Sequence, residues 1–378
     1  MKRWMVLICA AAVLLTMPAG AVEVAAQAAL LMEKETGEIL YAKNEHEQLE
    51  PASVTKVMTL LLVMEAIDNG QLSYDDIITG SAHACSMGGS QIWLKEGEKM
   101  TVRDMLKAVF VVSANDCAVA LGEAVSGSEM AFVDRMNERA GELGMHDTTF
   151  RNATGLPTEG HMTSAHDIAL MSRELIRNHP EVREYTTIWM DTLRNGASEL
   201  VNTNKLIRSY DGATGLKTGS TSTAMYCISA TAERNGMELI SVILKSPTGN
   251  QRVADAKALL DHGFANYALV KAAADEALPP LPVTLGTQAT VQPVLEERSV
   301  LLEKAKASKL TKTLELLEGV EAPVAKGDVL GCLRILSGEE LVAEVPVLAG
   351  EEIPRLTWGQ MARRLIRSAL LAGTVDGR

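Results

Sequence analysis

The stretch Pro51-Ala-Ser-Val-Thr-Lys56 is followed directly by the apolar run Val57-Met-Thr-Leu-Leu-Leu-Val63, which predicts a buried helix. Pro51 fits the start of a helix, because the N–H group that proline lacks has no intrahelical partner there. Ser53 and Lys56 are three residues apart, so a helix would place their side chains on one face. A serine hydroxyl needs an adjacent base to become a nucleophile, and a lysine can be that base where burial or nearby cations lower its pKa. The stretch therefore predicts a nucleophile with its base, and the competing interpretation is a capping serine beside a solvated lysine.

Two further motifs make the first one specific. Ser113-Ala-Asn115 begins 60 residues after Ser53, and Lys217-Thr-Gly219 begins 104 residues after Ser113. Ser-x-x-Lys, Ser-x-Asn and Lys-Thr-Gly together are the motifs of penicillin-recognising serine enzymes, and here they stand in the expected order and at the expected separations. Each motif alone is common, but their joint occurrence favours a serine acyl-transfer site.

The first 21 residues have the pattern of a secretory signal peptide. Met1-Lys-Arg3 is basic, residues 4–15 are a short apolar segment, and Ala19-Gly-Ala21 is a small-residue cleavage site. The apolar segment is too short to span a membrane comfortably, so we expect cleavage after Ala21 and export of the chain. Cys9 lies too early in the segment to be a lipoprotein cysteine.

Charge and cysteine content exclude several other classes of protein. Cleavage would remove Lys2 and Arg3 and no acidic residue, which takes the net charge from −12 to −14. Such an acidic chain is not expected to bind nucleic acid. The four remaining cysteines, at positions 85, 117, 227 and 332, are scattered and predict buried free thiols rather than disulfides. No Cys-x-x-Cys or His/Cys cluster points to a metal, and we expect no metal and no cofactor.

The remaining pattern predicts two domains. Apolar spacing predicts helices after Thr101, Asn115 and Ser164, and hairpins turn at Gly37 and Asn235-Gly236. The composition changes at the proline-rich segment 278–282, and short strands without candidate chemistry follow it. We therefore expect a signal peptide at 1–21, a motif-bearing domain at 22–277, a β-rich domain at 278–350 and a terminal helix at 351–378.

With these motifs in place, the chain resembles the low-molecular-mass penicillin-binding proteins that are D-alanyl-D-alanine carboxypeptidases. The resemblance covers essentially the whole mature chain. Beyond the trio, it rests on segments 88–91, 152–157, 202–205, 215–219, 324–328 and 353–358. It implies an α+β fold in which an antiparallel sheet is flanked by helices, with a helical subdomain and a small C-terminal β-sandwich.

The resemblance also implies the role of each motif residue, by its position in this sequence. Ser53 would be the acylated nucleophile, Lys56 its general base, and Ser113 a proton relay toward the departing D-alanine. The substrate-binding residues would be Asn115, Lys217, Thr218, Gly219 and Ser220. Among these, Asn115 would hold a substrate amide, and Lys217 and Thr218 the terminal carboxylate. Backbone N–H groups of Ser53 and Ser220 would form the oxyanion hole, although many members carry a histidine in place of Ser220. The implied partners are peptidoglycan stem peptides ending in D-Ala-D-Ala and β-lactam antibiotics.

Three alternative functions fit the sequence less well. A Ser-His-Asp hydrolase would need a Gly-x-Ser-x-Gly elbow, which the sequence lacks. His166-Asp167 is expected at a helix start, and His161 is expected on a solvated loop rather than facing the cleft. A β-lactamase would need a glutamate that activates water, and Glu174 is expected on a solvated helix face instead. A non-catalytic peptidoglycan-binding scaffold is disfavoured by the intact motifs.

The C-terminal segment differs in charge from the rest of the chain. From Arg355 onward there are five basic residues and one acid, Asp376, in a chain that is otherwise strongly acidic. A helix over residues 358–371 would carry an apolar side with Trp358, Leu365 and Ile366 and a basic opposite side. This pattern predicts an amphipathic helix on the anionic outer face of a bacterial membrane, and the competing interpretation is a helix packed on the β-rich domain.

Overall fold

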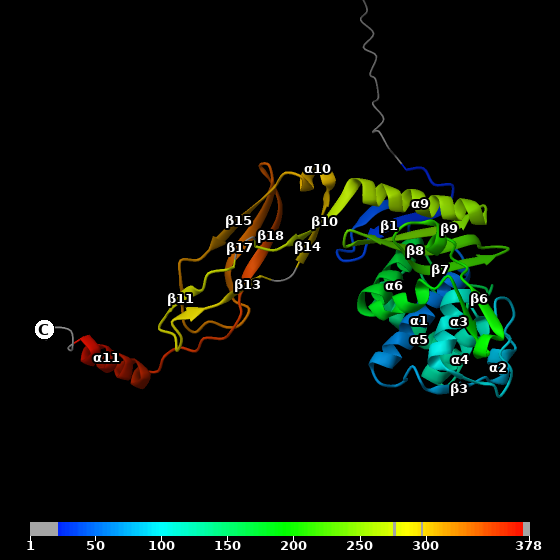
Figure 1. Ribbon diagram of the computed structural model, residues 1–378, viewed down its shortest axis with the longest axis horizontal. Helices are drawn as coiled ribbons and strands as arrows, with labels where there is room; N and C mark the ends of the chain where they lie inside the picture. The colour runs from blue at the N-terminus through cyan, green and yellow to red at the C-terminus, as the bar shows by residue number, and fades with distance from the viewer. Residues whose placement is uncertain (1–21, 275–276, 296–297, 373–378) are drawn as a thin grey trace, which may run out of the picture.

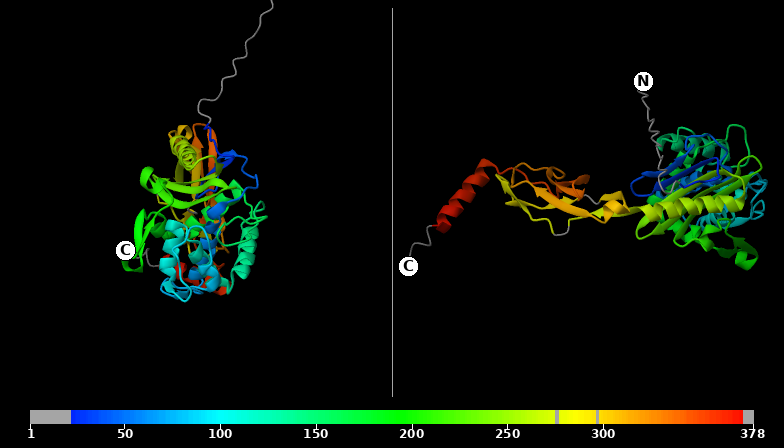
Figure 2. Two further views of the ribbon diagram at one scale, coloured as in Figure 1. Left: turned by 90° about the vertical axis from the view of Figure 1, so that its right-hand side faces the viewer. Right: turned by 90° about the horizontal axis from the view of Figure 1, so that it is seen from above.

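The computed structural model describes residues 22–274, 277–295 and 298–372. The predicted signal peptide and its cleavage site therefore lie outside the described residues. The molecule is elongated, with an α+β domain at one end, a β-rich domain in the middle and the helix α11 (Trp358–Ala372) at the other end (Figures 1 and 2).

A five-stranded antiparallel sheet organises the α+β domain. Its order is β2-β1-β9-β8-β7, so β7 lies at one edge. The strands are β1 (Ala28–Glu33), β2 (Ile39–Lys43), β7 (Ala213–Thr221), β8 (Met225–Arg234) and β9 (Met237–Ser246). Both predicted hairpins are confirmed, because β1 pairs with β2 around Gly37 and β8 pairs with β9 around Asn235-Gly236.

Helices cover both faces of this sheet. Strand β1 is buried on both sides: Leu31 packs in a cluster with residues of α9 (Gly249–Asn266), whereas Leu30 packs in a cluster with residues of the helical layer. Figure 1 shows α9 along one face and the layer with α1 (Lys56–Asp68) and α6 (Ala165–Asn178) along the other. Alternating strand residues thus serve two cores.

The helical subdomain contains α3 (Val102–Val112), α4 (Asn115–Ser126) and α5 (Glu129–Glu142). The predicted caps are present, since Thr101 Oγ1 accepts from Asp104 N and Ser164 Oγ accepts from Asp167 N. The shorter elements around this subdomain and before the sheet edge are β3 (Ile77–Thr79), α2 (Ala82–Cys85), β4 (Lys99–Thr101), η2 (Pro180–Val182), α7 (Arg183–Thr186), β5 (Met190–Leu193), η3 (Arg194–Gly196), β6 (Ser198–Val201) and α8 (Leu206–Ser209).

The beginning of α1 differs from the expectation. Pro51 does not open the α-helix; a 3₁₀ turn, η1 (Ala52–Thr55), comes first, and α1 begins at Lys56. Ala52, the first residue of this turn, has a φ of +47°, in the left-handed region. The residue before the candidate nucleophile therefore adopts a conformation that residues with a Cβ rarely take.

The second domain is built of short strands. A four-stranded sheet has the order β13-β18-β17-β15, and a three-stranded sheet has the order β12-β11-β16. The elements that follow α9 are β10 (Tyr267–Ala272), β11 (Leu281–Thr284), β12 (Thr290–Val291), β13 (Pro293–Leu295), β14 (Arg298–Glu303), α10 (Lys304–Ala307), β15 (Leu310–Leu316), β16 (Val320–Glu321), β17 (Val329–Ser337) and β18 (Glu340–Ala349). Strand β10 pairs with β14 across the position of the expected boundary. The predicted α+β class with a C-terminal β domain is confirmed.

Candidate active site

The start of α1 brings the predicted nucleophile and base together. Nζ of Lys56 lies 3.0 Å from Oγ of Ser53 and donates a second hydrogen bond of 2.7 Å to the carbonyl oxygen of Thr154. Lys56 is completely buried, whereas Ser53 is partly exposed. The predicted shared face is confirmed as geometry, with a 3₁₀ turn instead of an α-helical turn between the two residues.

The surroundings of Lys56 favour its neutral form. Burial lowers its pKa well below the ordinary value, the positive charge of Lys217 lowers it further, and the carboxylate of Asp116 opposes both effects. Burial is the largest of these causes. A lysine in this state can accept a proton from an adjacent hydroxyl near neutral pH.

The second motif lies at the junction of α3 and α4. Ser113 ends α3 with a φ of +63°, and its buried Oγ has no hydrogen-bond partner among the described residues. Nδ2 of Asn115 donates to the carbonyl oxygen of Gly88 over 2.6 Å, while its Oδ1 has no partner in the described part of the chain. An unpaired buried hydroxyl and an unpaired amide oxygen are groups that a substrate can satisfy.

The third motif lies on the edge strand β7. Gly219 approaches the 3₁₀ turn so closely that a Cβ at this position would lie 2.7 Å from the backbone N of Ser53. Thr218 Oγ1 donates to Thr203 Oγ1 over 2.7 Å, and Ser220 is exposed. The structure thus brings Gly219, and with it the exposed residue Ser220, next to the nucleophile.

Lys217 on the same strand is buried, and its Nζ donates to the carbonyl oxygen of Thr218 over 3.0 Å. Burial lowers its pKa to about 7, with a smaller contribution from the charge of Arg252. Arg252 itself donates to the carbonyl oxygens of Gly219 and Cys227 over 3.2 and 3.1 Å. A substrate carboxylate beside Lys217 would favour its ammonium form.

Several residues that support the site were missed by the sequence reasoning. Asp116 is fully buried and accepts from the backbone N–H groups of Ile92 and Leu94, which anchors the 88–94 segment beside Asn115. Asp116 directly follows the Ser113-Ala-Asn115 motif, and this position is the feature of the sequence that could have identified it. Thr154 supplies the carbonyl oxygen that accepts a hydrogen bond from Lys56. It belongs to the 152–157 segment, which supported the resemblance but had no function assigned to it.

Two expectations for individual side chains are wrong. His161 is not a solvated loop residue; it is 3% exposed, and both ring nitrogens have partners. Glu174 is not on a solvated helix face, because its Oε1 forms a 2.5 Å ion pair with Arg139 and its side chain is only 25% exposed. Tertiary contacts, which local spacing does not reveal, cover both residues.

The prediction of free cysteines holds, although Cys85 and Cys332 are only partly buried.

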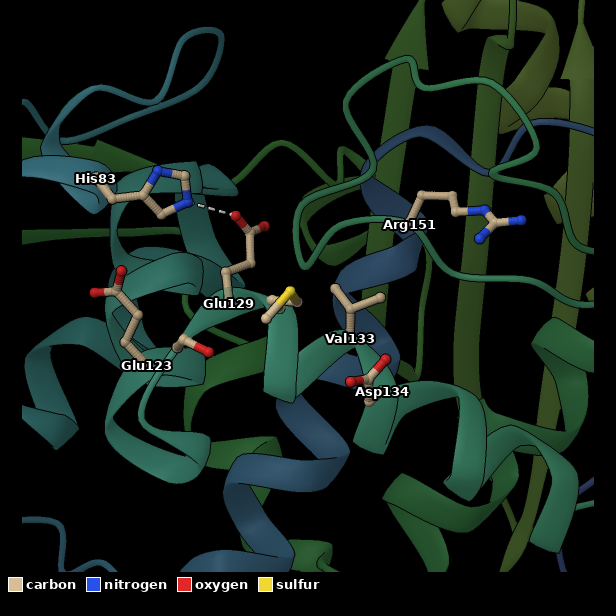
Figure 3. Close-up of a pocket in the computed structure, with 8 residues that line it drawn as sticks. His83, Glu123, Glu129, Val133, Asp134 and Arg151 are labelled. Carbon is tan, nitrogen blue, oxygen red and sulfur yellow. Dashed lines mark hydrogen bonds and ion pairs between the residues drawn. The ribbon is translucent and has the colours of Figure 1, made fainter.

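A pocket of about 590 Å³ is lined by residues that include His83, Glu129 and Arg151 (Figure 3). Oε2 of Glu129 lies 2.6 Å from Nε2 of His83, and Oε1 of Glu129 accepts from the backbone N–H of Ala153. The next residue, Thr154, holds Lys56. The pocket therefore contains a hydrogen-bonded pair, His83 and Glu129, that anchors Ala153, the residue before Thr154.

The α+β fold, the contact between Ser53 and Lys56, and the approach of Gly219 to the backbone of Ser53 are consistent with the class of penicillin-recognising serine enzymes. A model of the D-alanyl-D-alanine carboxypeptidase family matches residues 15–248, and a model of the penicillin-binding protein 5 C-terminal domain matches residues 272–355. The chain therefore belongs to the D-alanyl-D-alanine carboxypeptidase family, and the activity predicted from the sequence is confirmed at this level.

Individual relatives agree with this assignment. The chain is 40% identical to D-alanyl-D-alanine carboxypeptidase DacF of Bacillus subtilis over 87% of this chain and 86% of that protein. Penicillin-binding protein 5 of Haemophilus influenzae is 30% identical and superposes with a TM-score of 0.77 over 88% of this chain and 98% of that chain. Penicillin-binding protein D2 of Listeria monocytogenes, solved in an ampicillin-bound form, is 37% identical and superposes with a TM-score of 0.59 over 65% of this chain and 99% of that chain.

Proposed function

We propose that this protein removes the terminal D-alanine from peptidoglycan stem peptides ending in D-Ala-D-Ala, through an acyl-enzyme on Ser53, and that β-lactams acylate the same oxygen. The observation that carries the proposal is the 3.0 Å contact between Oγ of Ser53 and Nζ of the fully buried Lys56. A nucleophile in contact with a desolvated lysine is the arrangement that serine activation requires.

The first half-reaction transfers the acyl group. Neutral Lys56 takes the proton as Oγ of Ser53 attacks the carbonyl carbon of the penultimate D-alanine. The backbone N–H groups of Ser53 and Ser220 stabilise the oxyanion, and one such donor is worth roughly 10²–10³ in rate. When the C–N bond breaks, the proton passes through Ser113 to the nitrogen of the departing D-alanine. Water then hydrolyses the ester and regenerates the Ser53 hydroxyl.

The remaining motif residues bind the substrate. Lys217 and Thr218 anchor the terminal carboxylate by charge-assisted hydrogen bonds, which a peptidase specific for a free C-terminus needs. Asn115 holds a substrate amide through its unpaired Oδ1. Because β7 is an edge strand, its backbone is available to an extended peptide on the side away from β8.

Intact mass after incubation with benzylpenicillin tests this function. One covalent adduct is expected on the native protein and none on Ser53→Ala. Release of D-alanine from a peptide ending in D-Ala-D-Ala should be lost in the same variant. An adduct that persists on Ser53→Ala would refute the assignment of the nucleophile.

The chain is also proposed to work outside the cell, at the outer face of the membrane. In the part of the chain that the structure describes, no helix is long and apolar enough to cross a bilayer. In helix α11 three large apolar side chains are exposed, with Trp358 87%, Leu365 67% and Ile366 61% exposed. We assign 351–378 to a peripheral membrane anchor, 278–350 to a spacer domain and 22–277 to the enzyme.

A further inference from the structure

His161 connects the backbone of Arg151, the residue before the 152–157 segment, to the 3₁₀ turn that carries Ser53. The backbone N–H of Arg151 donates to its Nδ1 over 3.0 Å, and its Nε2 lies 2.8 Å from Oγ1 of Thr55. Because a backbone N–H can only donate, Nδ1 must be the unprotonated nitrogen, and Nε2 must carry the hydrogen. His161 therefore donates to Thr55.

Thr55 continues the hydrogen-bond chain within η1, the 3₁₀ turn that carries Ser53 and is called the nucleophile turn below. Its hydroxyl accepts from His161 and donates its own hydrogen over 2.9 Å to the carbonyl oxygen of Ala52. Ala52 has a φ of +47° and directly precedes Ser53. A left-handed alanine persists only where its surroundings hold it, so this hydrogen-bond chain is part of what holds the turn.

The same chain meets the segment that holds the base. Gly155 lies so close to the turn that a Cβ there would lie 1.8 Å from the carbonyl oxygen of Ala52 and 2.8 Å from Oγ1 of Thr55. Its neighbour Thr154 holds Lys56. The imidazole of His161 therefore lies where the nucleophile turn contacts the 152–157 segment.

We propose that neutral His161 is a positioning residue for acylation, which acts by fixing the Ala52–Ser53 backbone through the hydroxyl of Thr55. The inference rests on the proposed role of Ser53. It explains how Oγ and the backbone N–H of Ser53 are both aimed at a substrate carbonyl, since both depend on the conformation of this turn. His161 itself does not contact the reacting atoms.

Burial, more than the charged groups around it, keeps the imidazole neutral. Burial, the positive charge of Arg151 and, when it is protonated, that of Lys56 together lower the pKa of His161 to about 4. Glu50 is the carboxylate that lines the same small space beside Ala52 and Gly155. Protonation would place a second donor at Nδ1 against the N–H of Arg151 and break the chain at its first link.

The test compares paired variants of the two chain members. His161→Phe and Thr55→Val remove the hydrogen bonds and keep much of the shape, whereas His161→Gln and Thr55→Ser keep a donor and a hydroxyl. The exposed His146→Gln is the matched control. For each full-length protein, the dissociation constant of the initial penicillin complex and the first-order acylation constant are measured separately by stopped-flow fluorescence, together with Tm.

We expect His161→Phe and Thr55→Val to lower the first-order acylation constant by about 10- to 100-fold, as misplaced reacting groups do, with the dissociation constant changed by less than about threefold. The double variant should be no slower than the slower single variant, because both break one chain. His161→Gln and Thr55→Ser should recover most of the rate. Native-like acylation constants in both disrupted variants, or multiplicative losses in the double variant, would overturn the proposal.

A measurement on the unmodified protein covers the case in which the variants fail to fold. In ¹⁵N spectra of histidine-labelled protein, His161 should be a neutral ring with its hydrogen on Nε2 at pH 5.5, and the opposite tautomer would overturn the proposal. Penicillin labelling of Ser53→Ala distinguishes failure of the proposed function from failure of the proposed role of His161. If that variant still reacts, the proposed nucleophile is wrong; if it does not react but His161→Phe acylates normally, only the role of His161 fails.

Discussion

Lys56 and Ser53 are in hydrogen-bond contact at the start of α1, with 3.0 Å between Nζ and Oγ, and the lysine is completely buried. Contact and burial are both needed, since proximity lets the proton move and desolvation lets the lysine accept it. Substitutions of Lys56 and Lys217 can distinguish the proposed base from the proposed carboxylate-binding lysine.

Lys56→Arg should abolish acylation. Arginine keeps the positive charge but does not lose its proton in any accessible pH range, so it cannot act as the base. We expect the rate of penicillin adduct formation to fall by at least about 10³-fold, a loss within the range of general-base catalysis. Rapid-quench mass spectrometry measures the rate, and circular dichroism checks the fold. A folded variant with near-native acylation would show that another group takes the proton.

Lys217→Gln should lower kcat/KM more for a peptide with a free C-terminal carboxylate than for the same peptide with a C-terminal amide. A peptide ending in a free carboxylate loses a charge-assisted partner, whereas its C-terminal amide loses only a neutral one. The expected drop in kcat/KM is therefore about tenfold greater for the acid than for the amide. Parallel kinetics on the two peptides make the comparison, and equal losses would rule out carboxylate anchoring.

His161 should make the protein less stable in mild acid. Its pKa is about 4 in the folded state and about 6.5 when unfolded, so the unfolded chain binds more protons between these values. Stability that is complete above pH 6.5 is then lost as pH falls toward 4, by about 3 kcal/mol from this group. Urea unfolding at pH 7 and pH 4.5 should show a smaller loss in His161→Gln. The exposed His146→Gln should behave like the native protein, and an identical loss in all three proteins would assign the acid sensitivity elsewhere.

Gly155→Ala should be far more damaging than Gly127→Ala. Both glycines have a φ of +81°, so the backbone penalty is matched. A Cβ at Gly127 meets no atom within 4 Å, whereas a Cβ at Gly155 would overlap the carbonyl of Ala52. The difference in unfolding free energy should be at least about 2 kcal/mol, from overpacking alone. Denaturant titration of both variants measures it, and similar values would mean that the turn moves aside easily.

Removal of residues 355–378 should reduce binding to vesicles that contain anionic lipid. The exposed apolar side of α11 and its arginines are the proposed contacts, and binding should weaken as salt increases. Co-sedimentation of the mature and truncated proteins provides the measurement. A full-length variant carrying Leu365→Gln and Ile366→Gln is the matched control for loss of the apolar contacts. Equal recovery of all forms in the pellet would leave α11 without a membrane role.

The sequence by itself determined the features that depend on neighbours along the chain. Three-residue spacing places Ser53 and Lys56 on one face, the capping threonine begins α3, and Gly37 and Asn235-Gly236 turn the hairpins. Motif order was enough to identify the family, and the apolar spacing together with the basic residues from Arg355 onward predicted an amphipathic terminal helix. These are short-range effects of backbone geometry and composition.

Only the tertiary structure decided what these residues can do chemically. The low pKa of Lys56 comes from burial, and the Thr154 carbonyl that holds it is 98 residues away along the chain. The neutral state of His161 likewise depends on burial and on a backbone N–H that the sequence does not point to. Desolvation and hydrogen-bond pairing belong to the assembled environment, so no local pattern can specify them. For that reason the motifs predicted a nucleophile and a base, but the folded chain alone determines that the lysine can act as one.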